Sequence, residues 1–287
     1  MITIRSITEL RQAIRQRRQQ GQSIGFVPTM GNLHEGHLQL VTAAKQQCDC
    51  VVTSIYVNPT QFGPNEDFDN YPRTEERDSQ QLASVNNDLL FLPNTDTIYP
   101  NGKPPEVTID LPTLSNLLCG ASRPGHFGGV ALVVTKLFNI VQPDTAFFGQ
   151  KDFQQLLIIK RLVRELMLPV AIMGVPTVRE PNGLAMSSRN QYLTDEEKHQ
   201  AGQLYQALTE TASALKKGTL PLSSQALQQH TQSVIEQLSA AGFEPDYFEI
   251  RNQVNLATPQ AENKQLVLLI AAKLGKARLI DNLSIDL

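Results

Sequence analysis

Two histidines separated by two residues, His34 and His37, are the side chains whose type and spacing best suit catalytic chemistry. They follow a short apolar run at residues 24–27 and precede apolar residues spaced three to four apart, which places them on one side of the first turn of a predicted helix. A helix start favours an anion, and imidazole can donate a hydrogen bond to a phosphate oxygen or carry charge near neutral pH. The pattern therefore predicts a nucleotide phosphate site.

The same histidine pair has two other interpretations, a pair of solvated helix caps or half of a zinc site. The zinc interpretation is weak because H-x-x-H lacks the four-residue spacing of the zinc-protease helix, and no carboxylate or cysteine ligand is evidently placed. Gly31 and Gly36 would let a ligand approach the backbone. The preceding strand, these glycines and the following helix favour the phosphate site.

Segments along nearly the whole chain resemble, in order, the signature blocks of the pantothenate synthetase family. This family belongs to the HxGH-type nucleotidyltransferases, which are related to the class I aminoacyl-tRNA synthetases. The matching blocks are PTMG (28–31), HEGH (34–37), NPTQFG (58–63), YPRT (71–74), RPGHF (123–127), FFGQKDFQQ (147–155) and MSSR (186–189). The resemblance implies ATP-dependent condensation of pantoate with β-alanine through a pantoyl adenylate, releasing AMP and pyrophosphate, by a homodimer.

The resemblance also implies roles for individual residues. His34, His37 and Lys151 would bind and stabilise the phosphates, and Ser187, Ser188 and Arg189 would hold the β and γ phosphates from a mobile loop. The implied nucleotide contacts are Met30, Gly31, Asn32, Leu33, His34, Glu35, Gly36, His37, Gly149, Gln150, Lys151, Asp152, Val178, Met186, Ser187, Ser188 and Arg189.

The acid substrate and the metal have their own implied residues. Gln61 and Gln155 would bind pantoate, because their amides can donate to carboxylate and hydroxyl oxygens, and Asn58 and Tyr71 would be further contacts. Triphosphate chemistry implies Mg²⁺, and Asp78 matches an acidic position near the family's metal site. Its neighbour Arg77 departs from relatives that carry a second carboxylate there.

Alternating strands and helices must position these residues. Predicted strands at 2–4, 24–27, 51–57, 89–92, 145–148 and 170–175 alternate with helices at 8–20, from 37, at 74–85, 125–141 and 151–166. This order predicts an α/β fold with a Rossmann-like, doubly wound parallel sheet. A polar loop (179–192), helices at 194–217 and 223–241, and three strands then predict a smaller C-terminal α+β domain. We expect a nucleotide- and pantoate-binding domain at 1–177 and a lid domain at 178–287.

Composition limits the remaining possibilities. A net charge of −3 provides no broad electrostatic footprint for nucleic acid, so no nucleic-acid partner is expected. The apolar runs are too short to span a membrane. The three cysteines form no secreted disulfide framework and fit a reducing cytoplasm.

Three alternative functions share parts of this pattern. A nucleotidyltransferase acting on a phosphorylated acceptor would need further basic residues, whereas Gln61 and Gln155 suit a carboxylate and a hydroxyl. A non-catalytic nucleotide-binding module would have no reason to combine His34, His37, Lys151 and Arg189. A tRNA synthetase would need a longer chain with a basic extension. The carboxylate-amine ligase accounts for the most residues.

Overall fold

The computed structural model describes residues 1–64, 66, 68–102 and 105–287. The chain forms two compact units: Met1–Gln150 with Gln154–Pro176, and Lys151–Phe153 with Thr177–Leu287. The short segment that carries Lys151 thus belongs to the second unit, although it follows a strand of the first. The functions expected of residues 1–177 and 178–287 stay predictions.

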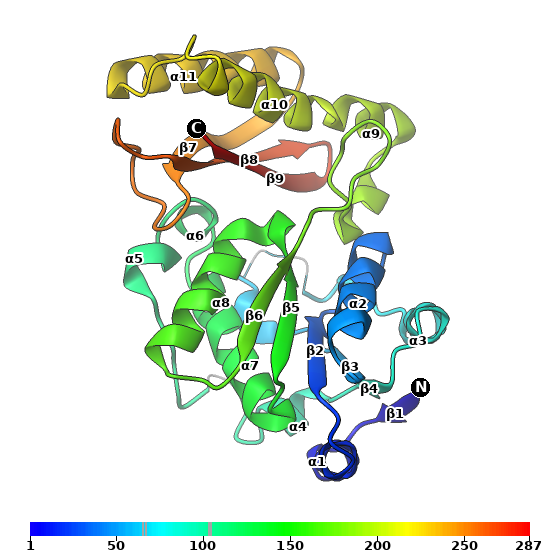
Figure 1. Ribbon diagram of the computed structural model, residues 1–287. Helices are drawn as coiled ribbons and strands as arrows, with labels where there is room; N and C mark the ends of the chain where they lie inside the picture. Colours follow the sequence, from blue (N-terminus) through cyan, green and yellow to red (C-terminus); the bar gives the residue numbers. More distant parts are fainter. Residues whose placement is uncertain (65, 67, 103–104) are drawn as a thin grey trace. The chain divides into compact units, whose positions relative to one another are not determined.

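A six-stranded parallel sheet forms the centre of the first unit (Figure 1). Its strands, from one edge to the other, are β1 (Ile2–Ile4), β4 (Leu89–Phe91), β3 (Cys50–Ile55), β2 (Ile24–Thr29), β5 (Thr145–Gly149) and β6 (Ala171–Val175). The order of connection reverses between β2 and β5, and such a reversal opens a crevice at the carboxyl ends of the strands. The predicted doubly wound sheet is confirmed.

Helices cover both faces of this sheet because alternate strand residues point to opposite sides. Ile24 and Phe26 pack with α1 (Ile7–Gln19), α7 (His126–Val141) and α8 (Phe153–Glu165). Val27 and Val51 pack on the other face with α2 (Glu35–Gln47) and α3 (Glu75–Ser84). These helices lie close to their predicted bounds.

Several short helical turns were not predicted from the sequence. They are η1 (Pro59–Gln61), α4 (Thr95–Ile98), α5 (Pro112–Ser115), α6 (Cys119–Ser122) and η2 (Gln150–Asp152). Two of them carry predicted site residues, since Gln61 ends η1 and Lys151 lies within η2. Lys151 was predicted at the start of an α-helix, whereas the α-helix begins at Phe153.

The second unit pairs three helices with a three-stranded antiparallel sheet. The helices are α9 (Asp195–Ala201), α10 (Gln203–Lys216) and α11 (Ser224–Ala240), and the strands, in spatial order, are β7 (Glu244–Asn252), β8 (Gln265–Leu274) and β9 (Ala277–Asp286). This confirms the predicted smaller α+β part. In the part of the chain that the structure describes, no helix combines the length and apolar character needed to span a bilayer.

The predicted helix 194–217 is two helices, α9 and α10, and this corrects the sequence prediction. Asn182 Nδ2 donates to the carbonyl of Lys198 at 2.7 Å, which a continuous helix would pair with the N–H of Gly202. The N–H of Gly202 bonds instead to Gln200. A Cβ at Gly202 would lie 2.6 Å from the carbonyl oxygen of Asn182, so glycine permits this close packing.

Candidate active site

His34 and His37 form a capping box at the start of α2, which follows β2. His34 is the N-cap residue, and its Nδ1 accepts a hydrogen bond from the N–H of Gly36 at 3.1 Å. Nδ1 of His37 accepts from the N–H of His34 at 3.3 Å. The two ring centroids are 4.1 Å apart. Both predicted histidines thus lie at a helix N-terminus, where they satisfy two backbone donors left unpaired by the helix.

These two hydrogen bonds decide where each neutral imidazole carries its proton. A ring nitrogen that accepts a hydrogen bond cannot also carry a hydrogen in that direction, so the proton of the neutral ring is on Nε2. Both histidines are therefore arranged to donate from Nε2 to an oxygen.

The turn that precedes His34 is held by Asp78 of α3. The N–H groups of Asn32 and Leu33 donate to the Asp78 carboxylate at 2.8 and 2.9 Å. The side chain of Asp78 has no exposed surface. Among residues 1–64, 66, 68–102 and 105–287, no group of three or more His, Cys, Asp or Glu could hold a metal ion. A metal contact by Asp78 stays a prediction, because Mg²⁺ bound to a nucleotide needs only one or two protein carboxylates.

The predicted acid-binding residues Asn58 and Gln61 are joined to each other in η1. Asn58 Nδ2 donates to Gln61 Oε1 at 3.1 Å, which directs the Gln61 amide nitrogen to Met30 Sδ at 3.0 Å. Asn58 Oδ1 accepts from the hydroxyls of Thr60 and Tyr99 at 3.0 and 2.9 Å. Gln61 is 8% exposed. This buried network fixes its amide as a donor beside Met30, another predicted site residue.

Two residues of α7 that were given no role in the sequence analysis hold η1 in place. His126 Nδ1 lies 2.8 Å from the carbonyl oxygen of Gln61, and because a carbonyl can only accept, the histidine is the donor. Gly129 accepts from Asn58 Nδ2 at 3.2 Å. His126 lies within the RPGHF block, which was the available sequence signal, whereas Gly129 had none.

We expect Gly129→Ala to destabilise the first unit. A Cβ at this position would lie 2.2 Å from the carbonyl oxygen of Thr60 and 2.7 Å from the N–H nitrogen of Gln61. Overpacking of this kind costs about 1–3 kcal/mol, and thermal unfolding should show a lower Tm. Gly149→Ala is the stability control, because its Cβ would meet no atom within 4 Å. Equal Tm values for both variants would contradict the expected clash.

The segment after η1 packs on its own aromatic side chains. Tyr71, predicted as an acid contact, is 6% exposed and packs edge-on to Phe62 with ring centroids 5.9 Å apart. Glu66 pairs with Arg123, whose Nε donates to its carboxylate at 2.8 Å. Burial acts to raise the pKa of Glu66, but the Arg123 guanidinium outweighs it and lowers that pKa. The pair therefore ties this segment to the start of α7 near neutral pH.

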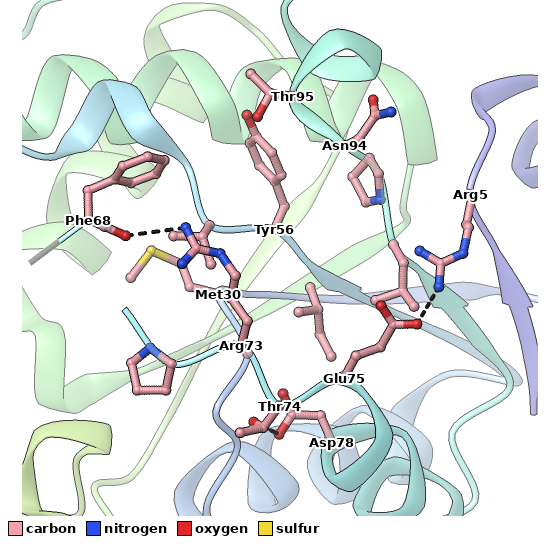
Figure 2. A pocket seen from close by; sticks show the side chains of 16 residues that line it. Arg5, Met30, Tyr56, Phe68, Arg73, Thr74, Glu75, Asp78, Asn94 and Thr95 are labelled. Atoms are coloured by element: carbon pink, nitrogen blue, oxygen red, sulfur yellow. Dashed lines mark hydrogen bonds and ion pairs between the residues drawn. The ribbon is translucent and has the colours of Figure 1, made fainter. Parts of the chain in front are cut away.

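A cavity of about 290 Å³ lies beside this segment at the carboxyl end of the sheet (Figure 2). Met30 and Gly31 reach it from β2, Tyr56 from β3, and Asp78 lies at its margin on α3. Burial raises the pKa of Tyr56 to about 12, so this phenol stays protonated. The cavity thus borders the turn that leads to His34.

Gly149 ends β5, and Gln150 follows it as the first residue of η2. Gln155 lies on the first turn of α8. A Cβ on Gly149 would meet no atom within 4 Å, which leaves room for a ligand beside the backbone. Gln155 is half-buried. Its neighbour Gln154 is 5% exposed and donates to the carbonyls of Leu114 and Leu117, so it holds structure together.

In the second unit, Lys151 is anchored through its backbone carbonyl. The Lys151 carbonyl accepts from Asn282 Nδ2 at 2.8 Å. Asn282 follows Asp281, a buried carboxylate that accepts both terminal nitrogens of Arg179. Burial raises the pKa of Asp281, and Arg179 offsets this in part. These bonds attach the Lys151 turn to β9.

The segment 179–192, predicted as a polar loop, contains local structure. The Met186 N–H donates to the Val178 carbonyl at 3.0 Å, which brings these two predicted nucleotide contacts side by side. Ser187 caps η3 (Ser188–Tyr192) by accepting from the N–H of Arg189 at 3.2 Å. Asn190 is buried and donates to the Ala185 carbonyl at 3.1 Å. The Ser187–Arg189 turn is therefore preformed.

The predicted site residues thus fall into two groups. The first unit brings together His34 with His37, and Met30 with Asn58 and Gln61, while Lys151, Val178, Met186 and residues 187–189 belong to the second unit. That both groups serve one nucleotide site stays a prediction.

Comparison with known proteins identifies the family. The model of the family described as pantoate-beta-alanine ligase matches residues 2–284. The chain is 53% identical to a pantothenate synthetase of Shewanella sp. (strain MR-7), over all of both chains. It is similar to the crystal structure of pantothenate synthetase from Thermus thermophilus, with a TM-score of 0.89, 42% identity and 99% coverage of each chain. A pantoate-beta-alanine ligase from Francisella tularensis, complexed with "Beta-gamma ATP and Beta-alanine", has a TM-score of 0.79 and 36% identity, covering 99% of this chain and 97% of its own.

Proposed function

The chain belongs to the pantoate-beta-alanine ligase family and catalyses the ATP-dependent formation of pantothenate from pantoate and β-alanine, and we propose that it does so through a pantoyl adenylate. A carboxylate is a poor electrophile because its oxygen is a poor leaving group. Transfer of AMP to that oxygen makes the carbonyl carbon open to attack by an amine. The enzyme must therefore align two substrates and stabilise developing charge.

The proposed reaction has two steps. A carboxylate oxygen of pantoate attacks the α-phosphorus of ATP. The bond from that phosphorus to the oxygen that bridges the α- and β-phosphates breaks, and pyrophosphate leaves. The neutral amine of β-alanine then attacks the adenylate carbonyl, a C–N bond forms, the C–O bond to AMP breaks, and the amine loses a proton to solvent. No covalent bond to the enzyme is needed.

His34 and His37 are proposed to donate from Nε2 to phosphate oxygens during the first step. The observation that carries this proposal is the capping box, in which each Nδ1 accepts a backbone N–H. The donors are oriented before the substrate binds, and preorganised donors are worth more than flexible ones. We assign His37 to stabilisation of the α-phosphate as pyrophosphate departs.

The pantoate contacts are proposed to be Gln61 and Gln155, with Asn58 and Tyr71 in support. Asn58 Nδ2 donates to Gln61 Oε1 at 3.1 Å and so orients the Gln61 amide, whose nitrogen can then donate to the substrate carboxylate or hydroxyl without reorganisation. Burial of Tyr71 in an aromatic cluster gives it a packing role around the acid in this proposal.

The proposed nucleotide contacts include residues of α2, of the end of β5 and of the second unit. Lys151 would bring a positive charge to the phosphates, Ser187, Ser188 and Arg189 would hold the β and γ phosphates, and the Asp152 carboxylate would accept from ribose hydroxyls. The remaining proposed contacts are Met30, Gly31, Asn32, Leu33, Glu35, Gly36, Gly149, Gln150, Val178 and Met186. Closure of residues 186–189 over ATP would protect the adenylate from water, and ATP should then reduce proteolysis of this segment.

Three further features belong to the proposal. The nucleotide substrate is MgATP, whose metal is held chiefly by phosphates and water. The enzyme is a homodimer, as the family resemblance implies. It works in the cytoplasm, with which the buried thiols of Cys48 and Cys50 agree.

Isotope transfer tests the adenylate route. Pantoate labelled with ¹⁸O in its carboxylate is incubated with MgATP, with and without β-alanine, and the ¹⁸O content of the products is measured by mass spectrometry. We expect pyrophosphate release with pantoate alone, and one ¹⁸O atom in AMP when β-alanine is added. Unlabelled AMP, or ADP with labelled phosphate, would overturn the adenylate and indicate another activated acid.

A further inference from the structure

Asp78 makes a set of hydrogen bonds to the turn that directly precedes His34. It lies in the first turn of α3 with no exposed side-chain surface. Its Oδ2 accepts from the N–H of Asn32 at 2.8 Å, and its Oδ1 accepts from the N–H of Leu33 at 2.9 Å and from Thr74 Oγ1 at 3.1 Å. Each carboxylate oxygen thus binds a successive N–H group of the turn between β2 and α2.

This turn depends on outside support. Gly31 and Asn32 both have positive φ angles, 81° and 50°, and consecutive residues in this region are disfavoured for side chains other than glycine. A Cβ at Gly31 would lie 3.0 Å from Asp78 Oδ2 and 2.9 Å from Ile55 Cγ2. Glycine therefore lets the carboxylate approach closely enough to bond the next two N–H groups.

We propose that Asp78 is a positioning residue that sets the orientation of His34 and His37 by holding the Gly31–Leu33 turn against α3. Leu33 directly precedes His34, the N-cap of α2, and the His34 N–H in turn bonds to His37 Nδ1. A shift of the turn would move the His34 backbone and both capping bonds. The inference rests on the proposed roles of these two histidines.

A direct role as a metal ligand would require different surroundings. Mg²⁺ usually keeps several of its waters when a protein binds it, so a ligand oxygen should face a hydrated space. Asp78 lies at the margin of the cavity in Figure 2, but its side chain is fully buried and its oxygens bond the turn and Thr74. The two roles predict different responses to Mg²⁺.

The first experiment observes the histidine rings in the full chain, without nucleotide and with EDTA. Long-range ¹H–¹⁵N NMR should show the Nε2–H tautomer for His34 and His37 in the wild type. In Asp78→Asn the side-chain amide has only one acceptor oxygen, so one N–H of the turn faces an NH₂ group. The ¹H–¹⁵N cross-peak patterns of both the His34 and the His37 rings should therefore change. The His126 ring, which donates from Nδ1, should not change.

Asp88→Asn is the matched control for this experiment. Asp88 also accepts a backbone N–H in the first unit, that of Val51 at 2.7 Å, and it pairs with Lys45 in the last turn of α2, at the end of that helix opposite the histidines. Its substitution should leave the His34 and His37 rings as in the wild type. Rings in Asp78→Asn that match the wild type, in a folded protein, would overturn the proposal.

The second experiment measures pyrophosphate release as a function of Mg²⁺. Asp78→Asn should lower kcat about 10- to 100-fold, as a misplaced catalytic group does, with an unchanged Mg²⁺ concentration at half-maximal rate. If Asp78→Asn instead needs a roughly tenfold higher Mg²⁺ concentration for its half-maximal rate, and recovers the wild-type rate at high Mg²⁺, Asp78 is a metal ligand and the proposal is overturned. If pantoate elicits no release from any variant, the proposed function fails while the ring spectra still test Asp78.

Thr74→Val covers the case in which Asp78→Asn does not fold. This near-isosteric change removes the hydroxyl that donates to Asp78 Oδ1 and keeps the carboxylate. We expect kcat to fall about two- to tenfold, which corresponds to the contribution of one hydrogen bond. The NMR signals of the His34 and His37 rings should change, and the Mg²⁺ dependence of the rate should not. Wild-type rings and kcat in this variant would overturn the proposal.

Discussion

Replacing His37 with alanine is expected to lower the rate of pyrophosphate release from MgATP and pantoate by about 100- to 1000-fold, the effect of losing one preorganised donor to a developing oxyanion. The expectation follows from the Nδ1 of His37, which accepts the His34 N–H at 3.3 Å and leaves the proton on Nε2. Single-turnover release of labelled pyrophosphate measures the chemical step. His199→Ala, an exposed histidine on α9, is the control and should not change the rate.

Two further substitutions separate the cap from the donor. In His37→Asn the side-chain oxygen can replace Nδ1 as acceptor for the His34 N–H, but nothing replaces Nε2. In His37→Gln the longer amide can replace Nε2 as donor while the cap is lost. We expect the Asn variant to be about as slow as the Ala variant and the Gln variant to be faster. A fast Asn variant would show that His37 acts through the cap alone.

Replacing Gln61 with glutamate is expected to weaken pantoate binding by about 100-fold or more. Two like charges about 4 Å apart repel by about 4 kcal/mol at an effective dielectric constant of 20, and partial protonation of the new carboxyl reduces this cost. Gln61 is 8% exposed, so water screens the repulsion poorly. Calorimetric titration with pantoate measures the change in Kd.

The control for this prediction is Gln80→Glu, which adds the same charge at an exposed position of α3. It should bind pantoate as the wild type does. Gln61→Ala, which removes the donor without adding charge, should weaken binding less than Gln61→Glu. Wild-type affinity in Gln61→Glu would remove Gln61 from the acid site.

Hydrophobic periodicity was sufficient to predict the sheet of the first unit and its main helices. Strands such as β2 and β3 are rich in apolar residues because both faces are covered, and α7 is a long apolar helix. The break between α9 and α10 could not be predicted in this way, because it depends on the Asn182 side chain competing for the Lys198 carbonyl. Such competition is not a property of the helix sequence.

The candidate site likewise has features that the sequence predicted and features that it did not. The H-x-x-H spacing after a strand placed His34 and His37 at a helix start, because sequence neighbours on one turn are close in any helix. Nothing in the sequence indicated that the Asp78 carboxylate would accept hydrogen bonds from the N–H groups of Asn32 and Leu33, which are 46 and 45 residues away. The same holds for Gly129, whose missing side chain admits the backbone of η1.

The residue types that could do the chemistry, the family blocks that carry them and the order of strands and helices could all be read from the amino-acid sequence. The tertiary structure alone decided the tautomer of each histidine, the orientation of the Gln61 amide and the partners of Asp78. The physical reason is that local spacing specifies helices, strands and the residues that share a face. Hydrogen-bond direction and burial depend on atoms that distant segments supply only when the chain has folded.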